Sequence, residues 1–292
     1  MQTIDLNYVR AALPKRREDG HKGAFGKLLI VGGAVGYTGA PYLAALSAVR
    51  SGCGLVYLGV PERIWAAEAV KCSSAMPFPL PDDGAELTLA ALAPIRDKLK
   101  GCDVLALGPG LGRSGGHAVV GTLLRETEQP VVLDADGLNA LSRNLRSLDA
   151  RKGRVTVLTP HEGELARLLG ISLDELARRD RVETAREFAV AHSCVLVRKG
   201  HRTLIALPDG SVLENTCGGS ALSKGGSGDV LTGIIASLLA QGAQPEQAAG
   251  CGVWLHARAG DILSERMTPY CVTPEDVASA GLAAAFSEAC HE

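Results

Sequence analysis

One stretch of the chain, Ser223 to Gly233 (SKGGSGDVLTG), combines closely spaced glycines with a lysine, a serine and an aspartate. The apolar residues that follow, Val230 to Leu239, have helical spacing, so the glycines lie where a helix begins. The first N–H groups of a helix lack intrahelical partners, and the helix dipole favours negative charge there. We therefore predict an anion-binding cradle, with Ser227 as the helix N-cap, made of Gly225, Gly226, Ser227 and Gly228.

Asp229 is a carboxylate placed where an anion is expected to bind, which costs electrostatic energy. Proton abstraction from a hydroxyl that attacks phosphorus would account for it. The alternative is structural, because an aspartate in the first turn stabilises a helix by itself. Three glycines and Lys224 exceed what a cap requires, which favours the anion site. The segment lacks the Gly-Lys-Ser/Thr of a Walker A loop.

The elements that position this segment are short apolar runs, each ending in a polar or glycine-rich turn. They are Lys27–Val31, Val56–Val60, Val104–Leu107, Val131–Leu133, Val155–Leu158 and Cys194–Val197. Helical segments usually follow these runs, which predicts an α/β fold with a mostly parallel central sheet flanked by helices on both faces. Ligands bind at the carboxyl ends of such strands, so the turns should converge on one crevice. Residues 203–207 and 211–214 predict an antiparallel hairpin added at the sheet edge.

Several of these turns carry side chains or glycines that could contact a ligand. Gly108–Gly112 (GPGLG) permits close approach to a ligand, but the Gly-x-Gly-x-x-Gly dinucleotide fingerprint is absent. His161 is equally compatible with a structural role and with ligand contact. Asp134 and Asp136 could cap the next helix or hold magnesium weakly through water. The turn at 199–203 could be a solvated turn or a nucleotide contact.

Composition limits the possible functions. The 292 residues are 46% hydrophobic and 21% charged, with a formal net charge of −2, as in an ordinary globular protein with a sizeable core. Because no linker, charge block or low-complexity segment interrupts the chain, we predict a single domain over 1–292, with a lead-in helix and loop over 1–25. The near-neutral balance argues against nucleic-acid binding. Without a signal-peptide pattern or an apolar run of membrane-spanning length, we expect a cytoplasmic protein that does not bind membranes. The eight cysteines are scattered and are interpreted as free thiols.

Taken together, these motifs resemble the ADP/ATP-dependent NAD(P)H-hydrate dehydratase family of the ribokinase-like superfamily, over about residues 20–290. The segments that carry the resemblance are GYTGAPYLAALSAVRSGCG (36–54), LALGPGLG (105–112), VLDADGLNAL (132–141), LTPHEGELARLLG (158–170) and LSKGGSGDVLTGIIASLLAQG (222–242). Their order and spacing also agree with the family.

The resemblance implies repair of a nicotinamide cofactor. The S epimer of hydrated NADH or NADPH (NADHX or NADPHX) would be dehydrated with ADP or ATP and Mg²⁺, and ADP would give AMP and phosphate. Asp229 would deprotonate the added hydroxyl so that it attacks the terminal phosphoryl group. The hydrated cofactor would contact Ala40, Gly110, His161 and Asp229. The adenine nucleotide would be held by Lys199, Gly200, His201, Arg202, Thr203 and Gly228.

The resemblance also implies a homotetramer and, because the chain is too short to include one, a separate NAD(P)H-hydrate epimerase. One departure from the family pattern lies just before the cradle, where Gly219 stands at a position at which asparagine is common. Two other functions stay open. One is a kinase of the same superfamily for a thiazole or pyrimidine vitamin precursor, and the other is a nucleotide-binding regulator without activity. The preferences for ADP or ATP and for NADH or NADPH hydrate are also open.

Overall fold

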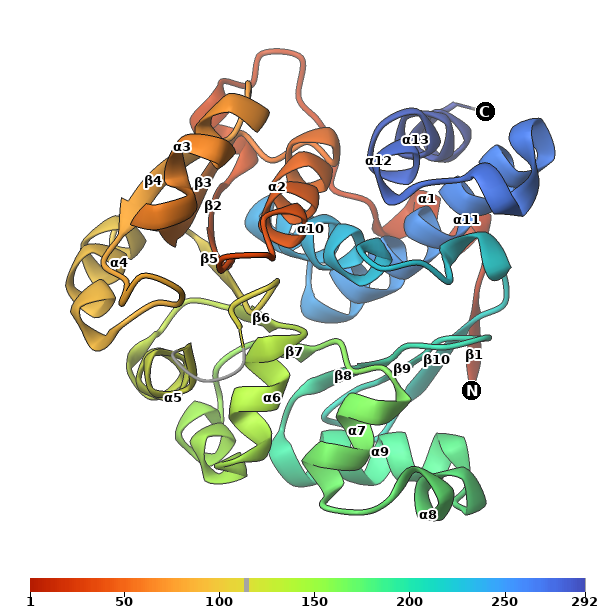
Figure 1. The fold of residues 1–292 in the computed structure, drawn as a ribbon. Helices are drawn as coiled ribbons and strands as arrows, with labels where there is room; N and C mark the ends of the chain where they lie inside the picture. Colours follow the sequence, from red (N-terminus) through yellow and green to blue (C-terminus); the bar gives the residue numbers. More distant parts are fainter. Residues whose placement is uncertain (113–115, 292) are drawn as a thin grey trace.

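The structure is a computed structural model that describes residues 1–112 and 116–291. A ten-stranded sheet runs through it in the order β1-β10-β9-β8-β7-β6-β5-β2-β3-β4 (Figure 1). The strands are β1 (Gln2–Ile4), β2 (Lys27–Val31), β3 (Leu55–Pro61), β4 (Met76–Leu80), β5 (Val104–Leu107), β6 (Val131–Leu133), β7 (Thr156–Leu158), β8 (Val195–Arg198), β9 (Leu204–Ala206) and β10 (Val212–Asn215). Only β9 runs antiparallel to its neighbours, so the predicted mostly parallel sheet is confirmed.

Successive residues of a strand point to opposite faces of the sheet. Apolar side chains on both faces are buried, which gives two hydrophobic cores. In β2, Leu28 and Ile30 belong to one hydrophobic core, whereas Leu29 and Val31 belong to the other. The first core is covered by α1 (Leu6–Ala12), α2 (Gly39–Arg50), α3 (Glu62–Lys71), α10 (Ser227–Ala240), α11 (Pro245–Cys271) and α13 (Leu282–Cys290). The second is covered by α4 (Leu92–Leu99), α5 (Gly116–Glu126), α6 (Asp136–Ser142), α7 (Glu162–Leu169), α8 (Leu173–Arg178) and α9 (Arg181–His192). This is the predicted arrangement of helices on both faces.

The ends of the sheet differ from the sequence prediction. The hairpin β9–β10 is antiparallel as predicted, but β1 pairs parallel to β10 and forms the edge. The edge prediction for the hairpin was therefore wrong, because a strand from the N-terminus, in the segment predicted as a lead-in helix and loop, covers it. Figure 1 shows β1 beside β10 at one end of the sheet, with β4 on the opposite side.

Helix boundaries near the cradle also need a correction. The N-cap of α10 is Gly226 in the left-handed conformation (φ +100°), and Ser227 is the first helical residue without a capping bond. The C-terminal segment begins at Thr273, with a capping box to Asp276. It continues as α12 (Pro274–Asp276), a π-helical turn (Val277–Gly281) and α13. Short 3₁₀ helices lie at Lys22–Phe25, Leu89–Ala91, Leu145–Arg151 and Ser220–Leu222. Within the described ranges, no helix combines the length and the apolar character needed to cross a membrane.

The parallel part of the sheet brings the predicted turns together. Strands β8, β7, β6, β5 and β2 are consecutive neighbours and run in the same direction, so their carboxyl ends meet at one edge. Helix α10 packs against α2 and also touches β5 and β6. Its first turn reaches the same edge, because Gly228 lies beside Lys199 and Asp134. The fold therefore places the cradle opposite the strand ends.

Candidate active site

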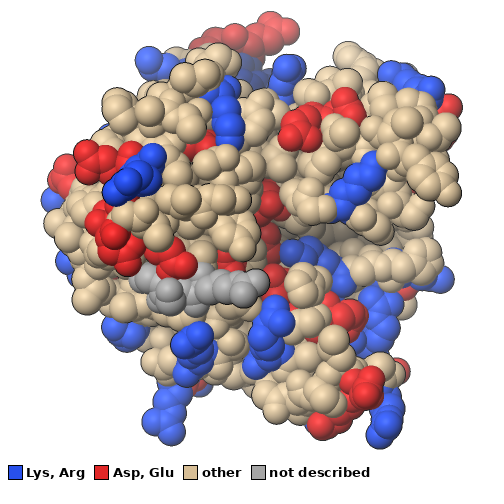
Figure 2. All heavy atoms as spheres, in the orientation of Figure 1, with Lys and Arg blue, Asp and Glu red and all other residues tan. Residues whose placement is uncertain are grey.

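A cavity of about 750 Å³ opens at this edge. Its walls come from the turns after β6, β7 and β8, from the Ser220–Leu222 helix and from the first turn of α10. Figure 2 shows a hollow in the middle of this face, with acidic and basic side chains both inside it. The rest of the face mixes the two signs of charge and shows no extended basic patch. The cavity therefore combines cationic and acidic groups with a helix start.

The floor of the cavity carries a buried ion pair. Lys199 Nζ donates to Asp134 Oδ1 at 2.8 Å and lies 3.9 Å from Glu164 Oε2. Thr232 Oγ1 donates to the other Asp134 oxygen at 2.8 Å, and Asp134 is only 1% exposed. Burial acts to lower the pKa of Lys199, but the carboxylates of Asp134 and Glu164 outweigh it and raise that pKa. Lys199 is therefore a fixed positive charge inside the cavity.

Asp229 lies in the first turn of α10, half-buried, at the same cavity. Burial raises the pKa of Asp229 to about 7, helped by the negative charge of Asp134 and opposed by Lys199. A carboxylate with this pKa can take up and release a proton near neutral pH, which is what a general base requires. The geometry is consistent with the role predicted for Asp229.

The glycine cradle is formed by backbone at the start of α10. The Val230 N–H makes the first helical bond, to the Gly226 carbonyl at 3.1 Å. The amides of Gly228 and Asp229 precede that bond, so helix formation leaves them available to a ligand. A Cβ atom added to Gly228 would lie 3.0 Å from Lys199 Nζ. Gly226, Ser227 and Gly228 line the cavity, whereas Gly225 is exposed and does not.

Lys224 has a different place from the one its sequence position suggests. Its ammonium donates to the carbonyls of Pro269 (3.3 Å), Tyr270 (2.7 Å) and Val272 at the end of α11. Cations bind favourably to the last carbonyls of a helix. Lys224 therefore ties the cradle loop to α11 while also lining the cavity.

His161 has the structural role that the sequence left open, and it also borders the cavity. As N-cap of α7, its Nδ1 accepts hydrogen bonds from the amides of Gly163 (3.0 Å) and Glu164 (3.3 Å). Glu164 Oε2 accepts from the His161 amide at 2.9 Å, which completes a capping box. Burial, then Lys199, lowers the pKa of His161. Its ring is thus a neutral acceptor at physiological pH, with part of its surface in the cavity wall.

The predicted nucleotide turn is only partly directed to the cavity. Lys199, Gly200, His201 and Thr203 line it. Arg202 is not among the lining residues, and its guanidinium forms a bidentate pair with Glu214 at 2.9 Å. The sequence prediction assigned all five residues of this turn to the nucleotide, because nothing in the sequence indicated that Arg202 would form an ion pair with Glu214 of β10.

Ala40 and Gly110 lie together, at the neighbouring strand ends. A Cβ on Gly110 would come within 3.0 Å of the Ala40 Cβ and 2.9 Å of the Tyr37 carbonyl. Gly110 has φ +64°, which glycine adopts without strain. The two residues are outside the lining of the cavity described above. Asp136 connects the regions, because its Oδ2 accepts from the Gly112 amide at 3.0 Å.

Sequence reasoning missed Glu164 and His256, which line the cavity, and the fully buried Thr232 behind it. Glu164 and Thr232 complete the surroundings of the Lys199–Asp134 pair, and His256 on α11 contacts Ser227. Glu164 could have been suspected because it follows His161 directly after a strand. His256 and Thr232 lie inside apolar helices, so only the packing of α10 and α11 reveals that His256 faces the cavity and that Thr232 supports Asp134 from behind.

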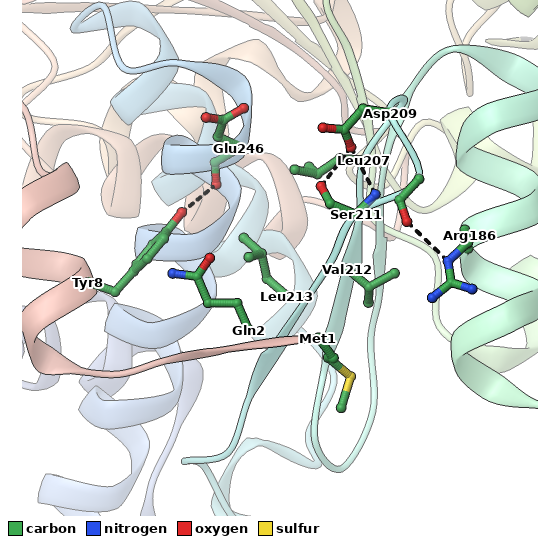
Figure 3. A pocket seen from close by; sticks show the side chains of 11 residues that line it. Met1, Gln2, Tyr8, Arg186, Leu207, Asp209, Ser211, Val212, Leu213 and Glu246 are labelled. Atoms are coloured by element: carbon green, nitrogen blue, oxygen red, sulfur yellow. Dashed lines mark hydrogen bonds between the residues drawn. The ribbon is translucent and has the colours of Figure 1, made fainter.

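A second cavity, of about 510 Å³, lies between β1, the β9–β10 hairpin and the start of α11 (Figure 3). Its polar groups bind one another: Tyr8 Oη donates to the Glu246 carbonyl at 3.2 Å, and the Ser211 amide and hydroxyl donate to Asp209. Arg186 donates to the Gly210 carbonyl at 3.0 Å. None of the residues predicted for the site lines it. The first cavity is the candidate active site.

Known relatives share this fold over nearly the whole chain. A ribokinase-like superfamily protein from Enterococcus faecalis superposes with a TM-score of 0.85 at 25% identity, covering 99% of this chain and 96% of that one. The Bacillus subtilis ADP/ATP-dependent NAD(P)H-hydrate dehydratase, co-crystallised with ATP and Mg²⁺, gives a TM-score of 0.80 at 29% identity, covering 99% and 98%. The predicted ribokinase-like fold is confirmed.

Sequence comparison with characterised proteins points to the same family as the structural comparison. The bifunctional NAD(P)H-hydrate repair enzyme of Moorella thermoacetica is 45% identical over 87% of this chain and 48% of its own length. The ADP-dependent (S)-NAD(P)H-hydrate dehydratase of Neisseria meningitidis is 40% identical over 86% of this chain and 81% of its own. The chain spans about half the length of the bifunctional relatives that it matches. The family model for NAD(P)H-hydrate dehydratase matches residues 28–281, and the chain belongs to that family.

Proposed function

We propose that this chain dehydrates the S epimer of hydrated NADH or NADPH in an ADP-dependent reaction that yields NAD(P)H, AMP and phosphate. The observation that carries the proposal is Asp229, a carboxylate with a pKa of about 7 at the start of α10, facing a cavity with a buried lysine. Membership of the NAD(P)H-hydrate dehydratase family supports the same reaction.

In the proposed mechanism, Asp229 removes the proton from the added hydroxyl, whose oxygen attacks the terminal phosphorus of ADP. The bond between that phosphorus and the bridging oxygen breaks, and AMP leaves. Phosphate then leaves the ring carbon, and loss of a proton from the neighbouring carbon restores the ring double bond. Overall, one water equivalent leaves the hydrate and one phosphoanhydride bond of ADP is spent.

The fixed charges of the site suit this transfer. Negative charge develops on the phosphoryl oxygens, and preorganised donors that face those oxygens lower the barrier. Such donors are present here: the amides of Gly228 and Asp229 and the ammonium of Lys199. They lie close together, since a Cβ atom added to Gly228 would be 3.0 Å from Lys199 Nζ. Lys199, Gly200, His201 and Thr203 would hold the nucleotide on one side, and Ala40, Gly110 and His161 would contact the hydrate on the other.

Magnesium fits this site as an ion held mainly by phosphates. Among the described residues, no group of three or more His, Cys, Asp or Glu side chains could form a protein cage. Mg²⁺ bound with nucleotides usually takes one or two carboxylates, phosphate oxygens and water. Glu164 would supply a carboxylate, whereas Asp134, whose two oxygens already accept from Lys199 and Thr232, would act only through its charge or through water. When bound, the ion would neutralise charge on the phosphates.

The direct test supplies hydrated NADH, ADP and Mg²⁺ and follows the near-ultraviolet absorbance of reduced nicotinamide, which the hydrate lacks. We expect the absorbance to return, with AMP and phosphate formed in equal amounts. Asp229→Asn should lose turnover but still bind ADP in calorimetry, because it keeps the size of the side chain and removes the base. Undiminished turnover in Asp229→Asn would remove it as the base, and a stable phosphorylated vitamin precursor formed from ATP would indicate a kinase instead.

A further inference from the structure

A buried serine–histidine pair joins the cradle to α11. Ser227 Oγ lies 3.1 Å from His256 Nε2, and both side chains are less than 10% exposed. Both residues also line the candidate active site. The Ser227 hydroxyl is therefore held from behind by His256, at the start of the helix that faces the ligand.

The Ser227 hydroxyl does not cap helix α10. Gly226 occupies the cap position, and Ser227 is the first residue inside α10. Within the described part of the chain, the hydrogen bond to His256 is the one that its side chain makes. A hydroxyl has one proton to donate and two lone pairs to accept with, so this bond leaves it further capacity.

The direction of the bond depends on which ring nitrogen of His256 carries the proton. Burial, then the charge of Lys199, lowers the pKa of His256 to about 4, so the imidazole is neutral at physiological pH. A neutral imidazole has one N–H. If that proton is on Nε2, His256 donates to Ser227 Oγ. If it is on Nδ1, Ser227 donates to His256.

The two directions have opposite consequences for an anion. When Ser227 gives its proton to His256, the hydroxyl turns only lone pairs toward the cradle, and these repel a phosphate oxygen. When Ser227 accepts from Nε2–H, its own proton is free to bind that oxygen, as a charge-assisted hydrogen bond. The amides of the same helix start also favour an anion. The second direction agrees with the rest of the site.

We propose that His256, as the Nε2–H tautomer, is a positioning residue that turns the Ser227 hydroxyl proton toward a phosphate oxygen of the bound nucleotide. The inference rests on the proposed function only in taking ADP as that nucleotide. A purely structural pair would fix α10 against α11 without favouring phosphate over any other part of the ligand.

Calorimetry with ADP and with adenosine separates these roles, because adenosine has no phosphate. In the full chain at neutral pH, His256→Leu and Ser227→Ala should each weaken ADP binding about tenfold, while adenosine affinity changes less than about twofold. His256→Gln, which keeps an N–H donor, should retain most of the ADP affinity. The double variant should be no weaker than the weaker single variant, because both changes remove one shared interaction.

Equal weakening of ADP and adenosine would overturn the proposal in favour of a structural pair. An effect of Ser227→Ala without one of His256→Leu would also overturn it, because Ser227 would then act alone. If His256→Leu does not fold, the unmodified protein still gives an answer through ¹⁵N NMR of labelled histidines. We expect the chemical shifts of an Nε2–H tautomer for His256, and an Nδ1–H tautomer would contradict the proposal. A chain that binds ADP through this pair but does not repair hydrated NADH would refute the proposed function alone.

Discussion

At the scale of single residues, the chemistry depends on how one lysine is shared among four carboxylates. Lys199 binds Asp134 directly and lies near Glu164, while Asp229 and Asp136 add further negative charge to the same region. One buried ammonium cannot neutralise all of them, so the least well-paired carboxylate holds its proton most strongly. Asp229 is in that position, and this repulsion adds to burial, the larger cause, in raising its pKa to a value suited to a base near neutral pH.

The first prediction concerns the pH dependence of turnover. Because burial and the charge of Asp134 raise the pKa of Asp229 to about 7, the ionised base is populated only as the pH approaches and passes that value. We expect kcat to rise with pH through about 7. Rates measured under saturating hydrate and ADP would show it, and a kcat that is constant between about pH 5 and 8 would contradict it.

The same shift predicts a change in stability. Asp229 binds its proton more tightly in the folded chain than in the unfolded one, where its pKa is near 3.8. The protonated side chain therefore contributes fully to the free energy of unfolding below about pH 4. That contribution, up to about 4 kcal/mol, is lost as the pH rises to about 7. Asp229→Asn should flatten the free energy of unfolding across this range. Denaturant unfolding at both ends of the range, for both proteins, measures it.

A matched pair of glycines tests the cradle. A methyl group on Gly228 would lie 3.0 Å from Lys199 Nζ and 3.6 Å from Asp134 Oδ2, whereas one on Gly225 would meet nothing within 4 Å. Gly228→Ala should displace the ammonium and weaken ADP binding about tenfold. Gly225→Ala is the control and should bind ADP normally. Equal affinities in the two variants would show that the spacing between Gly228 and Lys199 is unimportant.

Residue-scale features could be read from the sequence where the local pattern was unusual. The density of glycine around Asp229 marked the helix start, and Lys199 followed a strand directly. His256 and Lys224 have partners 29 and at least 45 positions away, so no local spacing revealed them. A Cβ atom added to Gly219, where the family resemblance led us to expect asparagine, would lie 3.9 Å from Asp261 Oδ1 and so would meet no clash.

At the scale of elements, the cradle is positioned by contacts between α10, α11 and the loop that precedes α10. Lys224 makes the link, because its ammonium binds three carbonyls at the end of α11. Thr268 in that end has φ +70°, and the helix is kinked there. The lysine thus satisfies carbonyls that a regular helix end would leave to water.

Lys224→Met tests this link, because methionine keeps much of the apolar stem and removes the three donors. We expect the free energy of unfolding to fall by about 1–2 kcal/mol. ADP binding should weaken as well, because the loop beside Gly226 loses its anchor. Lys100→Met is a suitable control, since Lys100 pairs only with the exposed Asp97 one turn away. Thermal unfolding and calorimetry that show no difference between the two variants would rule out an anchoring role.

Elements were predictable where an apolar run ended in a glycine-rich turn, and unpredictable at the sheet edges. Met76–Leu80 (MPFPL) contains two prolines, which disfavour a central strand. The strand β4 tolerates them because it pairs only with β3. The strand β1 has three residues, and it pairs with the distant strand β10, with Gln2 opposite Leu213. Neither feature has a periodicity that identifies it.

At the scale of the whole molecule, the order of the strands in the sheet decides which of the predicted site residues lie close together. Ala40 lies in the first turn of α2, which follows β2, and Gly110 lies just after β5. His161 and Lys199 follow β7 and β8, and Asp134 follows β6 between them. The parallel-sheet rule predicted from sequence that these strand ends share one edge, although Ala40 and Gly110 lie outside the lining of the cavity. It did not predict which side chains would be diverted to structural roles, because that depends on partners from distant elements.

The last prediction concerns stereochemistry and the limits of what this chain does alone. The proposed mechanism requires the hydroxyl to lie between Asp229 and the terminal phosphorus, and inverting the ring carbon directs the hydroxyl away from both. With a mixture of the two hydrate epimers, the S epimer should disappear and the R epimer should remain at early times. Chromatography that separates the epimers measures this directly. Adding a separate NAD(P)H-hydrate epimerase should then restore consumption of the remainder, with this chain still consuming ADP. Equal rates for both epimers without the epimerase would mean that the position of Asp229 does not select the substrate, and the arrangement proposed for the site would be wrong.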